Sequence, residues 1–463
     1  MIPEKNNQMV LPSVMSLAVP IAVETLLRNL INTMNVFLLS GYSDEAASGV
    51  GVANQVINIV LMFSMAISVG ASVIVNHDLG AGRRDMASVS AMNSLSVAFL
   101  FGAGVSLFLF FTAGPLMSAV GLTGATYDHA VSYLTVAGLS AGFLSLSQVL
   151  STIFRSYKNA RLSMLVITAV NAINLLFTHL SIRFESRLPF GAVTGVGLSK
   201  LICEILGVLI LGALMIRLGY GFSLYNAFHF DSKRVKELFS VGASASAESL
   251  SYNIGTLLTT SFIAKSSLGA LALSAKVYVG TVNPYEQVFG NALGQSGQII
   301  AGKLIGAGEY DEAQKRVNKL WKFLMISNVA SSLLLYIFHK PIIGLFTDDP
   351  QIIAMTGPLF LLEIVINASR TLNHCFNSGN RAAGYVFWPA MVALGSLWAI
   401  YVGCGYLFCN VLGLGITGIW IAMATDETTR GLTTGILWLT KKWQKKYRSS
   451  PAGKSGGDQA LGS

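Results

Sequence analysis

Charged side chains are scarce in this chain of 463 residues. They make up only 11% of it, against 53% hydrophobic residues and a mean hydropathy of +0.60. A soluble domain carries roughly 25% charged residues, so this chain could not cover soluble cores with polar surface. The composition therefore excludes a soluble protein and predicts an integral membrane protein.

Residues that build metal and catalytic sites are also few. The six histidines follow no HExxH spacing, and no CxxC pair occurs among the four cysteines, Cys203, Cys375, Cys404 and Cys409. These spacings are what zinc sites and redox sites require. No pair of intramembrane aspartates is present either. We therefore expect neither an enzyme nor a resident cofactor.

Long apolar segments fill most of the chain. Each is long enough to cross roughly 30 Å of hydrocarbon, which takes about 20 helical residues. The first half holds six of them, near 12–40, 48–76, 90–112, 129–153, 161–182 and 191–217. The second half holds six more, near 238–264, 270–302, 317–338, 352–379, 384–408 and 414–440. Since no period-2 alternation of a barrel appears, the predicted fold is all-α, with twelve transmembrane helices in two six-helix lobes.

The positions of the basic residues predict the topology. If the N-terminus is cytoplasmic, 22 of the 31 lysines and arginines fall in cytoplasmic segments, and the outside loops hold only Arg183, Arg187, Lys265 and Lys340. Such an excess is the positive-inside signal, so the net charge of +9 indicates topology and anionic lipid, not nucleic acid. The expected divisions are a cytoplasmic lead (1–11), an N-terminal lobe (12–217), a linker (218–237), a C-terminal lobe (238–440) and a basic, then disordered tail (441–463).

One stretch is written twice. The shift along the chain that places Glu24 on Glu248 also places Ser43 on Ser267 and Gly70 on Gly294. A shift two positions longer then places Gly80-Ala81-Gly82 on Gly306-Ala307-Gly308. Self-similarity on this scale indicates two related halves. Each half has an even number of helices, so both insert with the same orientation, and a pseudo-two-fold axis along the membrane normal should relate them.

Ionisable residues inside the membrane are costly and suggest function by default. Three pairs are spaced i,i+4 and can neutralise each other on one helix face: Glu24 with Arg28, Lys200 with Glu204, and Asp426 with Arg430. These pairs fit a structural role as well as a role in a cavity. Other ionisable residues have no such partner within one turn, namely Glu248, Lys276, Glu286 and Glu363. Arg370 lies two turns from Glu363, too far for a direct local pair, and we expect these unpaired groups to face a cavity.

Glu248 is the leading candidate for an ion site. It is a lone carboxylate in the helix that opens the second half, and Ser249, Tyr252, Asn253 and Thr256 offer oxygen atoms on neighbouring turns. A desolvated carboxylate can exchange a proton near neutral pH, and a carboxylate among oxygen ligands can hold Na⁺. Either event changes the local charge by one unit and can bias a two-state element.

Several motifs together resemble a known family. They are Pro20…Glu24, SGYSDEAASGVGVANQV (40–56), GAGRRDMA (80–87) with its echo GAGEYDEA (306–313), RSYKNAR (155–161) against NSGNRAA (377–383), and TGVGLSK (194–200) against TGIWIAM (417–423). Their order resembles the multidrug and toxic compound extrusion (MATE) transporters from about residue 12 to 440. The resemblance implies twelve helices in two lobes and export of organic, often cationic, compounds in exchange for Na⁺ or H⁺.

The resemblance also implies site residues, with departures. Glu248 matches the seventh-helix glutamate used for cation coupling, Asn380 stands where a tenth-helix acid is usual, and Glu363 could substitute for that acid. In the first half, Asn35 replaces an aspartate and Thr178 an acid, which puts a proton mechanism there in doubt. The predicted coupling set is Glu248, Asn253, Glu363 and Asn380, with Glu248 and Asn380 as ligands for a monovalent cation. The predicted substrate cavity contains Glu24, Asn35, Asn171, Asn174, Thr178, Tyr252, Lys276, Arg370, Asp426 and Glu427.

The expected function is cation-coupled antiport of organic compounds by alternating access. The expected partners are a small organic substrate and the lipid bilayer, with no nucleic acid, and we expect a monomer in the bacterial inner membrane. A lipid or glycan flippase of the wider superfamily, or a major facilitator transporter, is the alternative. A flippase typically has a basic cavity and extra helices, and the major facilitator loop has two separated glycines, unlike Gly80-Ala81-Gly82.

Overall fold

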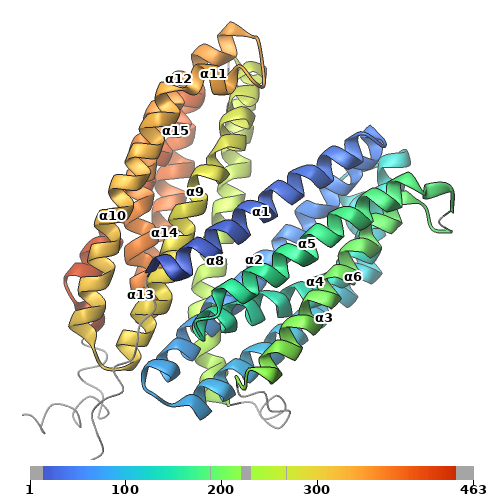
Figure 1. The fold of residues 1–463 in the computed structure, drawn as a ribbon. Helices are drawn as coiled ribbons and strands as arrows, with labels where there is room; N and C mark the ends of the chain where they lie inside the picture. Colours follow the sequence, from blue (N-terminus) through green and yellow to red (C-terminus); the bar gives the residue numbers. More distant parts are fainter. Residues whose placement is uncertain (1–13, 188, 221–230, 267, 445–463) are drawn as a thin grey trace, which may run out of the picture.

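The computed structural model describes residues 14–187, 189–220, 231–266 and 268–444. The predicted lead at 1–11, half of the predicted linker (221–230) and most of the predicted tail lie outside these residues. The described chain is helical, and its long helices form two bundles that meet near one end and diverge toward the other (Figure 1). The prediction of an all-α membrane fold is confirmed.

The first bundle has six long helices. They are α1 (Val14–Ser40), α2 (Asp44–Gly80), α3 (Arg84–Ala119), α4 (Gly124–Ser156), α5 (Ala160–Arg183) and α6 (Ala192–Arg217). Each corresponds to one predicted segment, and α2, α3, α4 and α5 extend beyond theirs at both ends. Local chemistry sets some of these ends: the Ser43 side chain accepts a hydrogen bond from Ala46 N at the start of α2, which satisfies a free helix N–H group.

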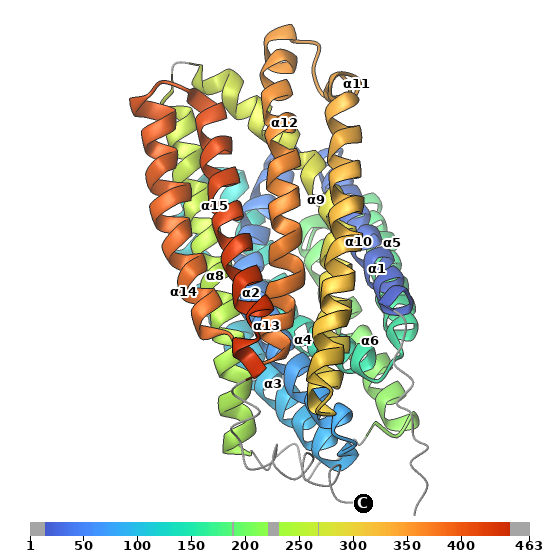
Figure 2. The same ribbon diagram turned by 90° about the vertical axis from the view of Figure 1, so that its left-hand side faces the viewer.

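The second bundle also has six long helical segments, two of them interrupted. They are α8 (Ser232–Ala264), α9 (Gly269–Gly306), α10 (Tyr310–Ile337), α12 (Pro350–Leu372) continued by η2 (Asn373–Asn377) and α13 (Ser378–Ala382), α14 (Phe387–Ser396) continued by η3 (Leu397–Cys404) and η4 (Leu407–Val411), and α15 (Gly415–Leu439). A short helix, α11 (His339–Ile343), follows α10. Figure 2 shows α10, α12, α14 and α15 side by side at the front.

Nine of these segments, among the described residues, are apolar and long enough to cross a membrane by composition alone. The other three long helices are α8, α9 and α15, which carry Glu248, Lys276 and Asp426 among their charged residues. Charge inside a helix lowers its hydropathy without shortening it. The three long helices with too little apolar character to be recognised by composition are therefore helices that carry candidate functional side chains.

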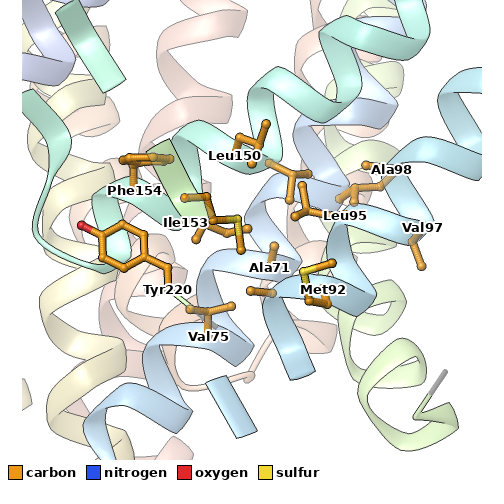
Figure 3. Close-up of a cluster of buried hydrophobic side chains, with 14 of the residues drawn as sticks. Ala71, Val75, Met92, Leu95, Val97, Ala98, Leu150, Ile153, Phe154 and Tyr220 are labelled. Carbon is orange, nitrogen blue, oxygen red and sulfur yellow. The ribbon is translucent and has the colours of Figure 1, made fainter. Parts of the chain in front are cut away.

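The two first helices cross between the bundles. Leu17 and Ile21 of α1 pack in cores with residues of α9, such as Ile300 and Val288. Correspondingly, Leu238 of α8 is buried in the core of the first bundle. Figure 3 shows part of that core, where Ala71 and Val75 of α2 lie near Met92 of α3 and Ile153 of α4. Each bundle thus buries the first turns of the other bundle's leading helix.

The bundles touch most closely where α2 and α9 end. We call this region the GAG end, because it holds Gly80–Gly82 and Gly306–Gly308. Gly82 (φ +72) and Gly308 (φ +81) have left-handed backbone, which glycine adopts without penalty and which ends a helix. A Cβ atom on Gly80 would overlap the carbonyl oxygen of Lys303, and one on Gly306 would overlap that of His77. The longer shift of the repeat places Gly80 on Gly306 and His77 on Lys303. The two glycine contacts are therefore equivalent and related by the two-fold relation of the halves.

Candidate functional site

Glu248, near the middle of α8, forms ion pairs with two other helices. Its Oε2 lies 2.7 Å from an Arg381 nitrogen and its Oε1 lies 3.6 Å from an Arg430 nitrogen. The Glu248 and Arg381 side chains are 22% and 23% exposed, whereas Arg430 is 7% exposed. As predicted, neither partner lies within one turn of Glu248 on its own helix. Its partners come from α13 and α15, which spacing along one helix cannot reveal.

A buried charge network continues from Arg430. One Arg430 nitrogen lies 2.8 Å from Asp426 and 2.9 Å from Glu427. Arg370 lies 3.4 Å from Glu427 and 3.4 Å from Glu363. The expectation that Arg370 and Glu363 are too far apart is thus wrong, because two long extended side chains span the two turns between them.

Neutral donors complete this network. Glu363 accepts hydrogen bonds from Trp420 Nε1 (3.0 Å) and Asn283 Nδ2 (2.9 Å). Glu427 accepts one from Asn373 Nδ2 (2.8 Å), and Asp426 accepts one from Ser396 Oγ (2.6 Å). Hydrogen bonds to a charged acceptor reduce the cost of burying it. The carboxylates are therefore held in fixed positions from α9, α14 and α15.

The network has more acids than bases. Its carboxylates are Glu248, Glu363, Asp426 and Glu427, and its guanidinium groups are Arg370, Arg381 and Arg430. Buried charge is stable when it is neutralised. Glu286 adds a further carboxylate, since its Oε1 accepts a hydrogen bond from Ser332 Oγ, which accepts one from Asn367 beside Arg370. A proton or a monovalent cation would therefore reduce the excess negative charge, and Glu248 is the most exposed of the ion-paired carboxylates.

Of the other predicted coupling residues, Glu363 belongs to the network, whereas Asn253 and Asn380 make contacts of their own. Asn380 is buried on α13 and its Nδ2 donates to the Thr434 carbonyl at 3.2 Å. Asn253 lies on an exposed face of α8, with its Nδ2 3.6 Å from the Met62 sulfur of α2. Within the described part of the chain, no three His, Cys, Asp or Glu side chains gather as metal ligands would. Of the predicted cation ligands, only Glu248 belongs to the network.

A matching ion pair lies in the first bundle. Glu24 of α1 is 2.8 Å from Arg155 at the end of α4 and 3.1 Å from Arg28. The Arg155 guanidinium also donates to Gln295 Oε1 of α9 at 3.0 Å. Glu24–Arg155 and Glu248–Arg381 are equivalent under the repeat, since the shorter shift relates the two glutamates and the longer shift relates the two arginines. The predicted contrast between a neutralised Glu24 and an unpaired Glu248 does not hold.

The two arginines of these pairs were missed as site residues, because both counted as loop cations. Matching RSYKNAR with NSGNRAA pairs Arg155 with Asn377, whereas the structure pairs it with Arg381. The backbone confirms this register: Lys158 (φ 70) and Gly384 (φ 59) both have positive φ, and the longer shift places one on the other. The offset of the Gly-Ala-Gly loops, applied further along the chain, would have found the pair.

The remaining predicted cavity residues divide into smaller groups. Asn35 Nδ2 donates to Asn174 Oδ1 at 3.2 Å between α1 and α5, whereas Asn171 bonds the Ile167 carbonyl of its own helix. Thr178 is buried on α5. In the second bundle, Tyr252 stacks on Tyr401 with ring centroids 6.0 Å apart, and Lys276 donates to the hydroxyl of Thr260 and, at 3.5 Å, to the Thr256 carbonyl.

Comparisons with known proteins agree with this architecture. The MatE family model matches residues 20–180 and 245–407. The chain is 32% identical to the uncharacterized transporter YisQ of Bacillus subtilis over 94% of this chain and 95% of YisQ. It is 24% identical to a probable multidrug resistance protein NorM of Thermotoga maritima, over 96% of each chain.

Solved structures share the fold at low identity. One, described as the outward-facing conformation of a multidrug resistance MATE family transporter of the MOP superfamily, has a TM-score of 0.85 and 17% identity over 92% of this chain and 95% of that one. Another is a MOP superfamily transporter from Pyrococcus furiosus, described as having a binding pocket of reversed polarity that suggests a different function. Its TM-score is 0.84, with 18% identity and the same coverage.

Proposed function

Because the chain belongs to the multidrug and toxic compound extrusion (MATE) family of membrane transporters, we propose that it exports organic, cationic or amphipathic compounds in exchange for Na⁺ or H⁺. We place it in the plasma membrane as a monomer, with both termini and the GAG end in the cytoplasm. The excess of basic residues on that side supports this orientation. The bundles meet at the GAG end and diverge from it (Figure 1), so this conformation would open to the outside.

One observation carries the coupling mechanism: the Glu248 network has more carboxylates than guanidinium groups, and Glu248 is the most exposed of its ion-paired carboxylates. A proton or Na⁺ arriving from outside would neutralise Glu248 and release Arg381. A cationic substrate arriving from the cytoplasm would displace the ion at the same carboxylate. A ligand shifts a conformational equilibrium only through its different affinity for the two states. Here the two states would differ in whether the Glu248–Arg381 ion pair is formed, and the ion would bind Glu248 more tightly where the pair is broken.

The test is export of a fluorescent cationic dye from proteoliposomes under separate Na⁺ and pH gradients. We expect one gradient to drive export and Glu248→Gln to abolish the gradient-driven part. Glu312→Gln is the matched control, because Glu312 forms an exposed pair with Arg316 on α10 and its loss should leave transport unchanged. Full gradient-driven transport by Glu248→Gln would disprove the role of Glu248. No response to either gradient would disprove antiport.

Arg381, the partner of Glu248, favours a second candidate class of substrate. Arg381 is as exposed as Glu248, so a molecule that carries an acidic group could bind Arg381. Arg370 does not offer this, since it is buried between two glutamates. An anionic dye that competes with the cationic one in the same assay, and competes less in Arg381→Gln, would support a zwitterionic or acidic substrate.

A further inference from the structure

We propose that His77 and Lys303 form a two-part latch that closes the GAG end, and that each part is tied to one Glu–Arg ion pair. The inference rests on the proposed function, because it treats the GAG end as the cytoplasmic gate. It assigns a positioning role in the transport cycle to two residues that touch neither Glu24 nor Glu248.

Each latch residue reaches across to the opposite bundle. Lys303 Nζ, at the end of α9, donates to the Ser156 carbonyl at 2.5 Å. His77 Nε2, at the end of α2, lies 2.5 Å from the Ala382 carbonyl oxygen and donates to it. Ser156 ends α4 and Ala382 ends α13. The last carbonyl groups of a helix have no partner within it and carry partial negative charge. Lys303 and His77 therefore each donate to a carbonyl group that the acceptor's own helix leaves without a partner.

The two contacts are copies of each other. The longer shift of the repeat places His77 on Lys303 and Ser156 on Ala382. The glycine contacts of the GAG end lie beside them, since Gly80 packs on the Lys303 backbone and Gly306 on the His77 backbone. Donor, acceptor and glycine of each repeat thus meet at one two-fold contact, so the latch has two equivalent halves.

The latch can also be released. Lys303 is 3% exposed, and the ion pairs of the described residues include none to its ammonium group. One hydrogen bond to a carbonyl oxygen offsets only part of the free-energy cost of burying this group. Opening the GAG end would hydrate Lys303 and remove that cost. The hydrogen bond therefore stabilises the closed state without making opening prohibitively unfavourable.

The ion pairs are adjacent to the latch along the chain. Arg155 and Ser156 are consecutive, as are Arg381 and Ala382. Glu24 and Glu248 therefore hold, through these arginines, the same helix turns whose carbonyl groups accept from Lys303 and His77. When Glu248 is neutralised, Arg381 is released and the end of α13 loses its anchor one residue before the His77 contact. Ion binding and gate opening are thereby coupled over one turn of helix.

The test measures opening of the GAG end directly. Ser72 is 7% exposed on α2, one turn before Asn76, and Ser72→Cys serves as a reporter in a chain whose four cysteines are replaced by alanine. A membrane-impermeant maleimide is applied to the cytoplasmic side of inverted vesicles. We expect His77→Ala and Lys303→Ala each to raise the labelling rate about fivefold, the effect of losing one ordinary hydrogen bond. Lys303→Arg, which keeps a donor, should restore slow labelling.

Lys319→Ala is the matched control, since Lys319 is exposed on α10. Unchanged labelling in both latch variants, or an equal rise in Lys319→Ala, would overturn the latch. Where a latch variant folds poorly in detergent, the disulfide rate of Asn76→Cys with Gly302→Cys gives the same answer, because a Cβ on Gly302 lies 3.1 Å from that of Asn76. Loss of His77 or Lys303 should slow this cross-link.

A double-mutant cycle tests the coupling. Glu248→Gln should raise the labelling of Ser72→Cys when His77 is present and add little in His77→Ala. Effects that multiply independently would overturn the link between ion pair and latch. Labelling needs no transported substrate, so a chain that fails the dye assay can still show the latch, and a chain that transports can still lack it.

Discussion

Gly80, the last residue of α2, packs so closely on Lys303 of α9 that a Cβ atom there would overlap the Lys303 carbonyl oxygen. Gly306 makes the equivalent contact with His77. Gly80→Ala and Gly306→Ala should therefore each force α2 and α9 apart and open the GAG end. Labelling of the Ser72→Cys reporter from the cytoplasmic side measures this, and we expect a rise of about tenfold, equal to roughly 1.4 kcal/mol in the gate equilibrium.

The same two helices supply the controls. Gly51 of α2 and Gly280 of α9 have no atom within 4 Å of a Cβ built on them. Gly51→Ala and Gly280→Ala should leave labelling unchanged and, as helix-interior changes from glycine, stabilise the protein slightly. If all four alanine variants label alike, the close packing at the GAG end has no role in closing it.

Arg370 should be among the residues most needed for stability in the second bundle. It is buried between Glu363 and Glu427, 3.4 Å from each, so Arg370→Gln would leave two buried carboxylates without this cation. Breaking a buried pair on one side costs about 3–5 kcal/mol. Thermal unfolding in detergent should show a large fall in Tm.

The comparison for Arg370 is an exposed pair of the same chemistry. Arg316 lies 2.8 Å from Glu312 with half of its side chain exposed, and exposed pairs contribute about 0–1 kcal/mol. Arg316→Gln should leave Tm nearly unchanged. Equal Tm values for the two variants would contradict the stabilising role of the buried network.

The twin arginines should matter equally for transport. Arg155→Gln and Arg381→Gln each remove a charge-assisted contact to a glutamate, at 2.8 and 2.7 Å. Such bonds are worth about 1.5–3 kcal/mol, so each variant should slow gradient-driven dye export by about tenfold or more. Arg161→Gln, a change at an exposed arginine near the same end, should have no effect. A defect in Arg381→Gln alone would show that the first-bundle pair is only structural.

A hydrogen bond at the end of the first bundle opposite the GAG end should make stability depend on pH. Tyr42, between α1 and α2, donates a 2.5 Å hydrogen bond to Glu185. This bond, with burial and the Glu185 charge, raises the pKa of Tyr42 from 10.0 to about 12. A raised folded-state pKa contributes stability that is complete below pH 10 and is lost as the pH rises toward 12. Tyr42→Phe should therefore be less stable than the wild type by up to about 1 kcal/mol at neutral pH, since the pair is partly exposed.

Thermal unfolding at pH 7 to 11 checks this. The Tm difference between wild type and Tyr42→Phe should shrink above about pH 10. A constant difference across that range would mean that packing of the ring, and not the Tyr42–Glu185 bond, stabilises the loop.

Local patterns in the sequence were enough for the fold. Long apolar runs located all twelve segments, including the three whose charged residues lower their hydropathy. The two offsets of the repeat indicated the two-fold relation. The helix ends were harder. α8 begins at Ser232, before the apolar segment predicted at 238–264, because its first turns are basic and still helical.

The site was predicted less well, because its contacts join distant segments. Glu248 stood out as a candidate, but its partners Arg381 and Arg430 lie on other helices, far along the chain. Helical spacing found Asp426 with Arg430 correctly and could not show that Arg430 also serves Glu427 and Glu248. Arg381 looked like a loop cation, since a lysine or arginine after an apolar segment usually is one. Only the register of the repeat distinguishes it.

Because α1 packs against the second bundle and α8 against the first, the two halves of the chain should depend on each other for stability. Each bundle has one core of its own and a second core that the leading helix of the other bundle completes. This is the arm exchange that a two-fold dimer of one six-helix chain would form, with each subunit lending its first helix to its partner. Two separately expressed halves should therefore each be unstable alone and assemble into a working protein when they meet in one membrane.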